Sequence, residues 1–278
     1  MGKSLFNIDM RKQININFVR KANITLLFAG FSYDDTGEKT KLMLNESLSF
    51  LKNHNNNPKI MLHLEGAQIL SHKPAYFFEF MKKGLKSIGL VHSHDNELAG
   101  SSSSSKNLGL SKKGKDIVKL AFQNHLMIDL AHMSKKSFSD IISLVNKPPF
   151  LSHTACYEIE HNPRNTTDIQ IKEIAKLGGV IGIFFSGKYV NSSKKPTIQD
   201  VAKHFEHVAG LIGTDYLAIG SDFGGITTGT PVGLESINKI PNLFIELEKR
   251  GFTTSDIKKI AYENAKRVIN NWWPNFLS

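Results

Sequence analysis

The chain reads LMIDLAHMSKKSFSDIISLVNKPPFLSH from Leu126 to His153, and this stretch decides the fold class. It begins and ends with a short apolar run that closes on a histidine, Leu126 to His132 and Pro149 to His153. Between the runs, Ser134 is a typical N-cap residue, and apolar residues follow it at helical spacing, namely Phe138, Ile141, Ile142 and Val145. A strand, a helix and a second strand in this order predict a β-α-β unit of a parallel sheet.

The same alternation continues over most of the chain. Seven apolar runs of strand type are separated by helical patterns, and they are Ile24 to Phe31, Lys59 to Gly66, Lys86 to His92, Leu126 to His132, Pro149 to His153, Gly179 to Phe185 and Tyr216 to Asp222. This predicts an α/β fold, and specifically a TIM-type (β/α)8 barrel. Its first strand is missing or altered, because Met1 to Lys21 is polar and weakly patterned. With no internal repeat or long linker, residues 1–278 are expected to form a single domain.

Composition limits the class of protein. The 278 residues are 40% hydrophobic, which allows a sizeable core and excludes a disordered chain. The formal charge is +10, but the basic residues are spread along the chain, so we expect no nucleic-acid partner. The single cysteine, Cys156, excludes an intrachain disulfide framework. No apolar run suits a membrane span or a signal peptide, so we expect no membrane association and a cytoplasmic location.

Ionisable side chains stand where the predicted strands end, and they are Glu65, His92, His132, His153 and Asp222. Because active sites of α/β barrels are built at the carboxyl ends of the strands, we expect these side chains to converge. Carboxylates and imidazoles are ligands that Zn²⁺ accepts without a thiolate, and a metal lowers the pKa of its bound water enough for attack on a carbonyl. A lone strand-end histidine is more often structural, so the prediction of a hydrolytic metal centre rests on the whole cluster.

Three other features have both a structural and a functional interpretation. Arg164, in HNPRNTTD, is either a surface partner of a helix start or, beside a metal centre, a bidentate ligand for a substrate carboxylate. The histidines outside the strand ends, such as His63 and His204, are interpreted as surface or packing residues in loops or helices. The low-complexity tract Ser101 to Ser105 is interpreted as a flexible loop.

From Ile8 to Asn270 the sequence resembles the membrane (renal) dipeptidase family of zinc metallopeptidases, and in particular its bacterial members. The resemblance is carried by the order and spacing of several stretches, which are HLEGAQIL, LVHSHDNELAGSS, GLSKKGKDIVKLAFQNHLMIDLAHMS, FLSHTACYEIEHNPRNTTDIQIKEIAKLGGVIGIFF, LAIGSDFGG and GLESINKIPNLFIELEKRGFTTSDIKKIAYENAKRVI. It implies an α/β barrel that binds two zinc ions and hydrolyses dipeptides, in many members with a D-residue at the C-terminal position.

The resemblance also implies roles for the strand-end residues. Glu65 matches the carboxylate that bridges the two metals, and His132 and His153 match the imidazoles of the second metal. By the same resemblance, His92 and Arg164 match side chains that hold the substrate, at the scissile carbonyl and at the free carboxylate.

Asp222 matches the acid that accepts and delivers protons. These roles agree with the map drawn from the strand ends alone.

The departure from the family is at the beginning. Family members have a first strand that ends in His-x-Asp and completes the first metal site, and no such pair precedes Glu65 here. A start codon assigned too late, a truncated gene or a real loss of the site would each produce this. With Glu65, His132 and His153 as ligands, one zinc ion with an open position is still an arrangement found in catalytic sites, and we expect one or two ions and activity below that of a full site.

The sequence therefore leaves several functions open. The first is a metallodipeptidase that acts on a dipeptide substrate. The second is a catalytically degenerate homologue that binds a ligand or a partner without hydrolysis. The third is a barrel hydrolase of another amide or lactam bond, which a requirement for a free carboxylate at Arg164 would distinguish from the first. The oligomeric state, including a homo-oligomer, is also left open.

Overall fold

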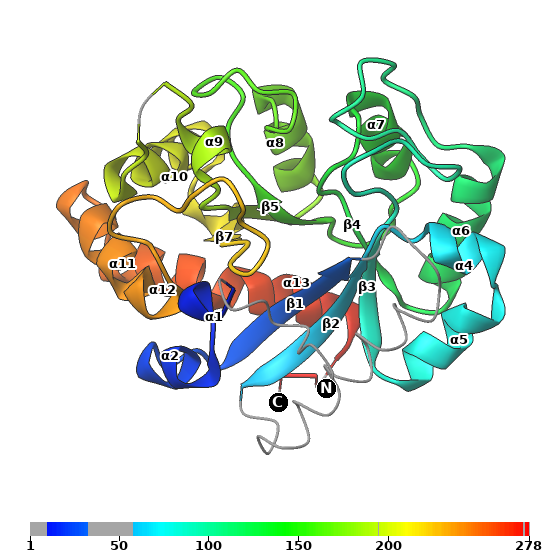
Figure 1. Cartoon of the computed structure of the whole chain (residues 1–278), viewed down its shortest axis with the longest axis horizontal. Helices are drawn as coiled ribbons and strands as arrows, with labels where there is room; N and C mark the ends of the chain where they lie inside the picture. Colours follow the sequence, from blue (N-terminus) through cyan, green and yellow to red (C-terminus); the bar gives the residue numbers. More distant parts are fainter. Residues whose placement is uncertain (1–9, 33–57, 194, 275, 278) are drawn as a thin grey trace. The chain divides into compact units, whose positions relative to one another are not determined.

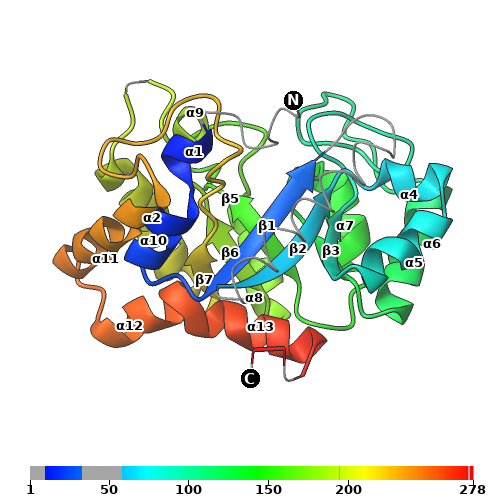
Figure 2. The ribbon, with the colours of Figure 1, turned by 60° about the horizontal axis from the view of Figure 1, so that its bottom comes forward.

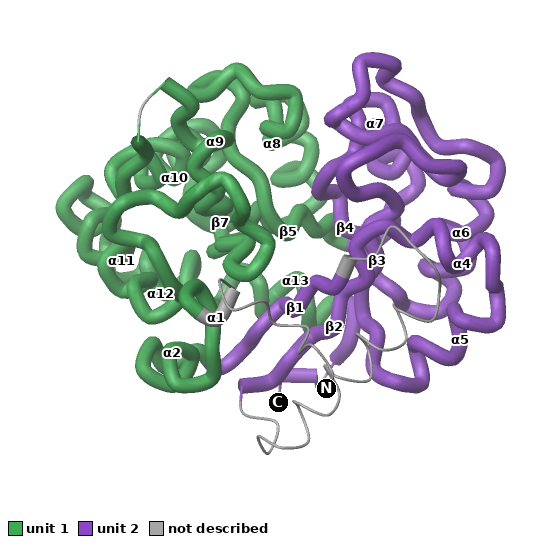
Figure 3. The backbone as a smooth tube through the Cα atoms, viewed as in Figure 1, with its two compact units in different colours: residues 1–24, 148–271 green, residues 25–147, 272–278 purple. Residues whose placement is uncertain are grey.

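The chain is described by a computed structural model, which covers residues 10–32, 58–193, 195–274, 276 and 277. It divides into two compact units, shown in different colours in Figure 3. Unit 1 holds residues 1–24 and 148–271, and unit 2 holds residues 25–147 and 272–278. The expectation of a single domain stays a prediction.

The described residues of unit 2 form four strands and the helices between them. Its elements are β1 (Leu26–Ser32), β2 (Lys59–Glu65), α4 (Gln68–His72), α5 (Ala75–Lys82), β3 (Leu85–Gly89), α6 (Lys112–Gln123), β4 (Met127–Asp129) and α7 (Lys135–Ile142). The strands pair in parallel in the order of the sequence, and β1, β2 and β3 lie side by side in Figures 1 and 2. The register aligns Glu65 with Gly89 and Gly89 with Asp129, so the carboxyl ends of three strands are level.

Unit 1 contains the last three strands and most of the C-terminal helices. Its elements are α1 (Met10–Gln13), α2 (Ile16–Lys21), β5 (Phe150–Thr154), α8 (Asp168–Lys176), β6 (Val180–Ile183), α9 (Gly187–Val190), α10 (Ile198–Ile212), the 3₁₀ helix η1 (Thr214–Tyr216), β7 (Leu217–Ile219), the 3₁₀ helix η2 (Ile237–Lys239), α11 (Ile240–Lys249), α12 (Thr254–Lys258), the π-helix η3 (Lys259–Glu263) and α13 (Asn264–Trp272). Strands β5, β6 and β7 are parallel neighbours in that order.

Local sequence explains these elements. The central residues of β2 are buried on both faces, as expected for a strand of a parallel sheet covered by helices. The predicted N-caps are confirmed, because Ser111 Oγ accepts from the Gly114 N–H at the start of α6 and Ser134 Oγ accepts from the Ser137 N–H at the start of α7. Asp200 Oδ2 accepts from the backbone N–H and the hydroxyl of Thr197, which begins α10.

All seven predicted strands are confirmed, with shorter bounds at the carboxyl ends. Glu65 is the last residue of β2 and His153 lies within β5, but His92, His132 and Asp222 each follow the last residue of their strand by three positions. Helix α7 ends at Ile142, so Val145 lies beyond it.

Residues 10–21, in the stretch where no strand was recognised, form two short helices, and residues 1–9 lie outside the described part of the chain. Within the described ranges, no helix combines the length and the hydropathy that crossing a bilayer requires.

Candidate metal centre

Three of the predicted site residues meet in unit 2. His132 Nε2 lies 3.0 Å from Glu65 Oε1, and His92 Nε2 lies 3.7 Å from Glu65 Oε2. The two imidazole rings pack edge to face, with their centroids 4.8 Å apart. One ligand atom from each residue lies within 4.8 Å of the other two, so the group could hold a metal ion.

The donor chemistry and the spacing of this cluster fit zinc. One carboxylate and two imidazoles are typical zinc ligands. None of the three residues is fully buried, so a metal ion can reach them from solvent. Donor atoms about 2.0–2.1 Å from a tetrahedral zinc ion are roughly 3.3 Å from one another. The two observed separations, 3.0 and 3.7 Å, bracket that value.

Backbone geometry directs Glu65 and His132 into the cluster. Gly66 has a φ of 84° and turns the chain directly after Glu65, and its N–H donates to Gly89 O on the neighbouring strand. His132 itself has a φ of 64°, which is uncommon for a residue with a Cβ atom. The turn before it is held by Asp129 Oδ1, which accepts from the Ala131 N–H at 3.1 Å.

The serine tract Ser101 to Ser105 is tied to this cluster at its first two residues. Ser101 Oγ donates to His92 O at 3.0 Å, and the Ser102 N–H donates to His132 O at 2.8 Å. Ser101 is also buried. The tract is a loop, as predicted, but its beginning joins the two segments that carry the imidazoles, which its composition alone did not reveal.

His153 lies in unit 1, near the end of β5. Its Nδ1 is 2.7 Å from Ser152 Oγ, and its ring centroid is 6.1 Å from that of Phe184. A hydrogen bond at one imidazole nitrogen fixes the ring orientation and is typical of histidines that bind a metal through the other nitrogen. This environment is compatible with the predicted role of His153 as a ligand.

Arg164 is held beside His153. Its Nη2 donates to His153 O at 3.1 Å, its guanidinium lies 5.4 Å from the centre of the Phe184 ring, and the residue is 7% exposed. The segment that carries it folds back onto β5, because Thr166 N–H donates to Ala155 O. Arg164 is therefore not a surface partner of a helix start.

Asp222 follows β7 in a tight turn. It has a φ of 61°, and its carbonyl accepts from the Gly225 N–H at 3.0 Å. A Cβ atom at position 225 would lie 2.4 Å from Asp222 Oδ1, so glycine is required there for the carboxylate to take this position.

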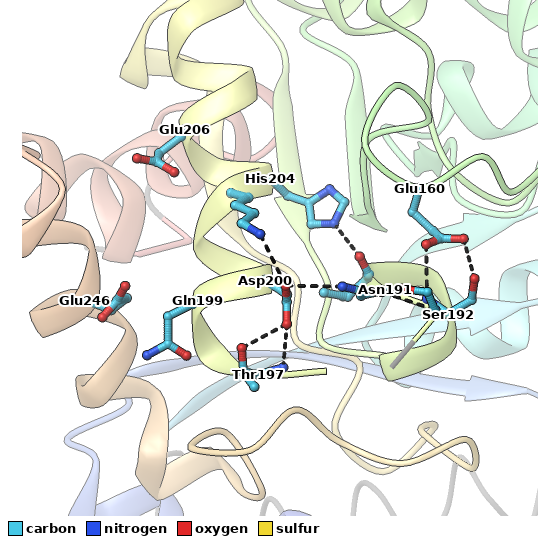
Figure 4. A network of polar contacts seen from close by, with 12 residues as sticks. Glu160, Asn191, Ser192, Thr197, Gln199, Asp200, His204, Glu206 and Glu246 are labelled. Atoms are coloured by element: carbon cyan, nitrogen blue, oxygen red, sulfur yellow. Dashed lines mark hydrogen bonds and ion pairs between the residues drawn. The ribbon is translucent and has the colours of Figure 1, made fainter. Parts of the chain in front are cut away.

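Two buried groups near β5 have structural roles. His204 accepts the Cys156 N–H at Nδ1 and contacts Val190 O through Nε2, both at 3.0 Å, and it is fully buried, which fits the packing role predicted for it. Figure 4 shows it beside the Asp200 and Asn191 side chains. Burial raises the pKa of the Cys156 thiol and so favours its neutral form.

The structure thus brings Glu65, His92 and His132 together, as expected from the strand ends, although the resemblance assigned His92 to the substrate. Arg164 and His153 are neighbours within unit 1. Sequence reasoning missed His63, which is a strand residue and not a loop or helix residue.

A second group in unit 1 joins Glu158, Asp168 and His207. His207 Nε2 lies 2.6 Å from Asp168 Oδ1, and Glu158 accepts from the Asp168 N–H, which accounts for these side chains as partners of the first turn of α8.

Comparison with known proteins relates the chain to dipeptidases and metallopeptidases. Dipeptidase verJ of Clonostachys rogersoniana is 32% identical over 213 residues, which are 76% of this chain and 54% of that protein. An amidohydrolase from Pseudomonas aeruginosa aligns with a TM-score of 0.84 at 23% identity, over 92% of this chain and 91% of its own. A metallopeptidase from Rhodobacter sphaeroides, solved with a phosphinate mimic of the dipeptide L-Ala-D-Ala, aligns with a TM-score of 0.80 at 18% identity, over 94% of this chain and 91% of its own.

These structural matches show the fold, which is the predicted TIM-type α/β barrel. The chain spans about half the length of the curated relatives it matches. A family model described as membrane dipeptidase, peptidase family M19, matches residues 33–272. The resemblance found in the sequence is confirmed, and the chain belongs to the membrane dipeptidase family.

Proposed function

We propose that this protein is a metallodipeptidase that hydrolyses dipeptides at a zinc centre built on Glu65 and His132. The observation that carries the proposal is the contact of 3.0 Å between His132 Nε2 and Glu65 Oε1, with His92 on the other carboxylate oxygen. Three such donors on separate segments of unit 2 are suited to a metal, and family membership makes peptide hydrolysis the chemistry to test first.

In this proposal Glu65 and His132 hold the metal, and His153 keeps the ligand role that the family resemblance implies. When bound, zinc would supply an acidic water and would polarise the scissile carbonyl. The second carboxylate oxygen of Glu65 faces His92, so the His92 imidazole can donate to a carbonyl oxygen at the same place or serve as a further ligand. Either role stabilises the negative charge that develops on the carbonyl oxygen in the transition state.

Arg164 and Asp222 complete the proposed site. A guanidinium binds a carboxylate through two parallel hydrogen bonds, so Arg164 is suited to the free C-terminus of a dipeptide. Asp222 would take a proton from the attacking water and pass it to the leaving amine.

The number of ligands bears on the rate. If Glu65, His132 and His153 alone hold the metal, they would bind one zinc ion, and a second positive centre for the oxyanion would be lacking. We propose that hydrolysis by these residues alone is slower than hydrolysis by a site with two metals.

The experiment is hydrolysis of L-Ala-D-Ala and L-Ala-L-Ala by the chain after loading with Zn²⁺, compared with His132→Ala. The matched control is His72→Ala, which removes a half-exposed histidine of the same unit that pairs with Glu97. We expect turnover in the parent chain and in the control, and loss in His132→Ala.

Cleavage of L-Ala-D-Ala amide at the same rate would contradict the role of Arg164 and favour hydrolysis of another amide bond. Stoichiometric zinc without turnover of any dipeptide would contradict the enzymatic proposal and favour a ligand-binding homologue.

A further inference from the structure

A buried imidazole and a buried carboxylate lie in unit 2, apart from the proposed ligands. His63 is 2% exposed and Asp129 is 1% exposed, and His63 Nε2 lies 3.4 Å from Asp129 Oδ2. The other ring nitrogen, Nδ1, lies 3.2 Å from Ser87 Oγ, which is fully buried. The three side chains come from three neighbouring strands, β2, β3 and β4.

Each residue of this pair lies two or three positions before one of the proposed ligands in the sequence. His63 precedes Glu65 by two residues on β2, so both side chains are on the same face of the strand. Asp129 is the last residue of β4 and precedes His132 by three. Its Oδ1 accepts from the Ala131 N–H, and this bond holds the turn that leads to the unusual backbone of His132.

The surroundings of His63 are built to fit its ring. Phe28 on β1 stacks on the imidazole, with ring centroids 4.8 Å apart. Gly30 and Gly89 lie on either side, where an added Cβ atom would be 3.5 Å and 3.6 Å from carbon atoms of the imidazole. The ring is therefore held in one position by contacts on several sides.

Packing alone does not require this pair. Removing an imidazole and a carboxylate from water is unfavourable, and apolar side chains of similar volume are often as stable or more stable in such a place. A buried polar group that does not improve stability is best explained by the specific geometry that it imposes.

We propose that His63 and Asp129 are positioning residues that join β2 to β4 and thereby set the separation of Glu65 and His132. This inference rests on the proposed function only for the claim that Glu65 and His132 bind a metal. The His63–Asp129 contact fixes the strands, and Asp129 also fixes the turn before His132, so both donors are held at the spacing that a tetrahedral ion needs.

The test is a titration with Co²⁺, whose visible absorption reports the affinity and the geometry of its ligands. The informative variant combines His63→Leu with Asp129→Ala, which leaves no unpaired buried charge and keeps the combined side-chain volume similar. We expect this variant to remain folded and about as stable as the parent chain, to bind Co²⁺ about tenfold more weakly or worse, and to show an altered spectrum.

The control is Asn264→Ala in unit 1, which removes a buried amide that donates to Thr214 O and Leu217 O. It is expected to lower the thermal midpoint and to leave the Co²⁺ affinity unchanged. Asp129→Asn, which removes the charge and can still accept from the Ala131 N–H, gives a second test if the double variant does not fold, and it should bind Co²⁺ more weakly than the parent chain but more tightly than the double variant.

The outcomes separate the two proposals. A parent chain that binds no Co²⁺ overturns the metal centre and this inference with it. A parent chain that binds Co²⁺, together with variants at His63 and Asp129 that bind with the same affinity and the same spectrum, overturns only the positioning role.

Discussion

Acidification from pH 7 to pH 5 is expected to destabilise unit 1 through His204. The imidazole is fully buried in α10, and burial lowers its pKa from 6.5 to about 4. The contacts explain why the neutral form is retained. Because the Cys156 N–H donates to Nδ1, that nitrogen carries no proton, and the Nε2–H donates to Val190 O. A proton added at Nδ1 would remove the bond to Cys156 and place a charge in the core.

The direction and the size of the stability change follow from the difference in the pKa of His204 between the folded and the unfolded chain. A histidine whose folded pKa is lowered binds its proton more readily in the unfolded state, so stability is full above about pH 6.5 and falls as the pH approaches 4. At pH 5 the solution is about 1.5 pH units below the pKa of this group in the unfolded chain, whereas the folded chain stays mostly unprotonated at this group. The free energy of unfolding is therefore lower by about 2 kcal/mol than at pH 7.

The assay is urea unfolding at pH 7 and at pH 5, with labelling of the buried thiol of Cys156 as the readout. Because Cys156 contacts His204 directly, its labelling reports opening of the same part of unit 1. The comparison is with His204→Asn, whose side-chain oxygen can accept from the Cys156 N–H but does not titrate. The parent chain should lose about 2 kcal/mol more than the variant between the two pH values. Equal losses in the two proteins would refute the reasoning.

Three further predictions concern stability and metal dependence. Thr167→Ala removes the capping box with Gln170 at the start of α8 and should lower the free energy of unfolding by about 1 kcal/mol in urea titrations; no change would contradict the role of the cap. Gly182→Ala would place a Cβ atom 2.1 Å from Ser152 O, so this variant should show a much lower thermal midpoint, and a normal midpoint would contradict the packing of β5 on β6. A chelator should abolish dipeptide hydrolysis and Zn²⁺ should restore it, whereas activity that survives chelation would contradict the metal centre.

The order of strands was predictable because a buried parallel strand has a strong sequence signal. Each run of β-branched, Leu and Phe residues became a strand, and the serines at positions 111 and 134 marked the helix starts through the same hydrogen bonds that the residue type predicts. The carboxyl ends were less predictable. The apolar pattern continues for two residues past β3 and past β4, where the chain has already left the sheet to form the turns that carry His92 and His132.

The sequence predicted the site only to the extent that the chemistry of the residue types indicates it. Glu65 and His132 were identified because carboxylates and imidazoles that stand together at strand ends are typical metal ligands. The strand ends predicted that His92 would lie near Glu65, but they did not predict that the serine tract joins the segments of His92 and His132. His63 was missed because its neighbours Phe28, Ser87 and Asp129 come from three other strands, and no local pattern connects them. The single domain and the cytoplasmic location remain predictions.

The most direct test of the central claim is the anomalous scattering of crystals grown with zinc, measured on both sides of the zinc absorption edge. We predict one peak about 2.0–2.2 Å from a carboxylate oxygen of Glu65 and from Nε2 of His132. Crystals that contain zinc elsewhere or not at all, with Glu65 and His132 still 3.0 Å apart in direct contact, would contradict the claim that these side chains form a metal centre.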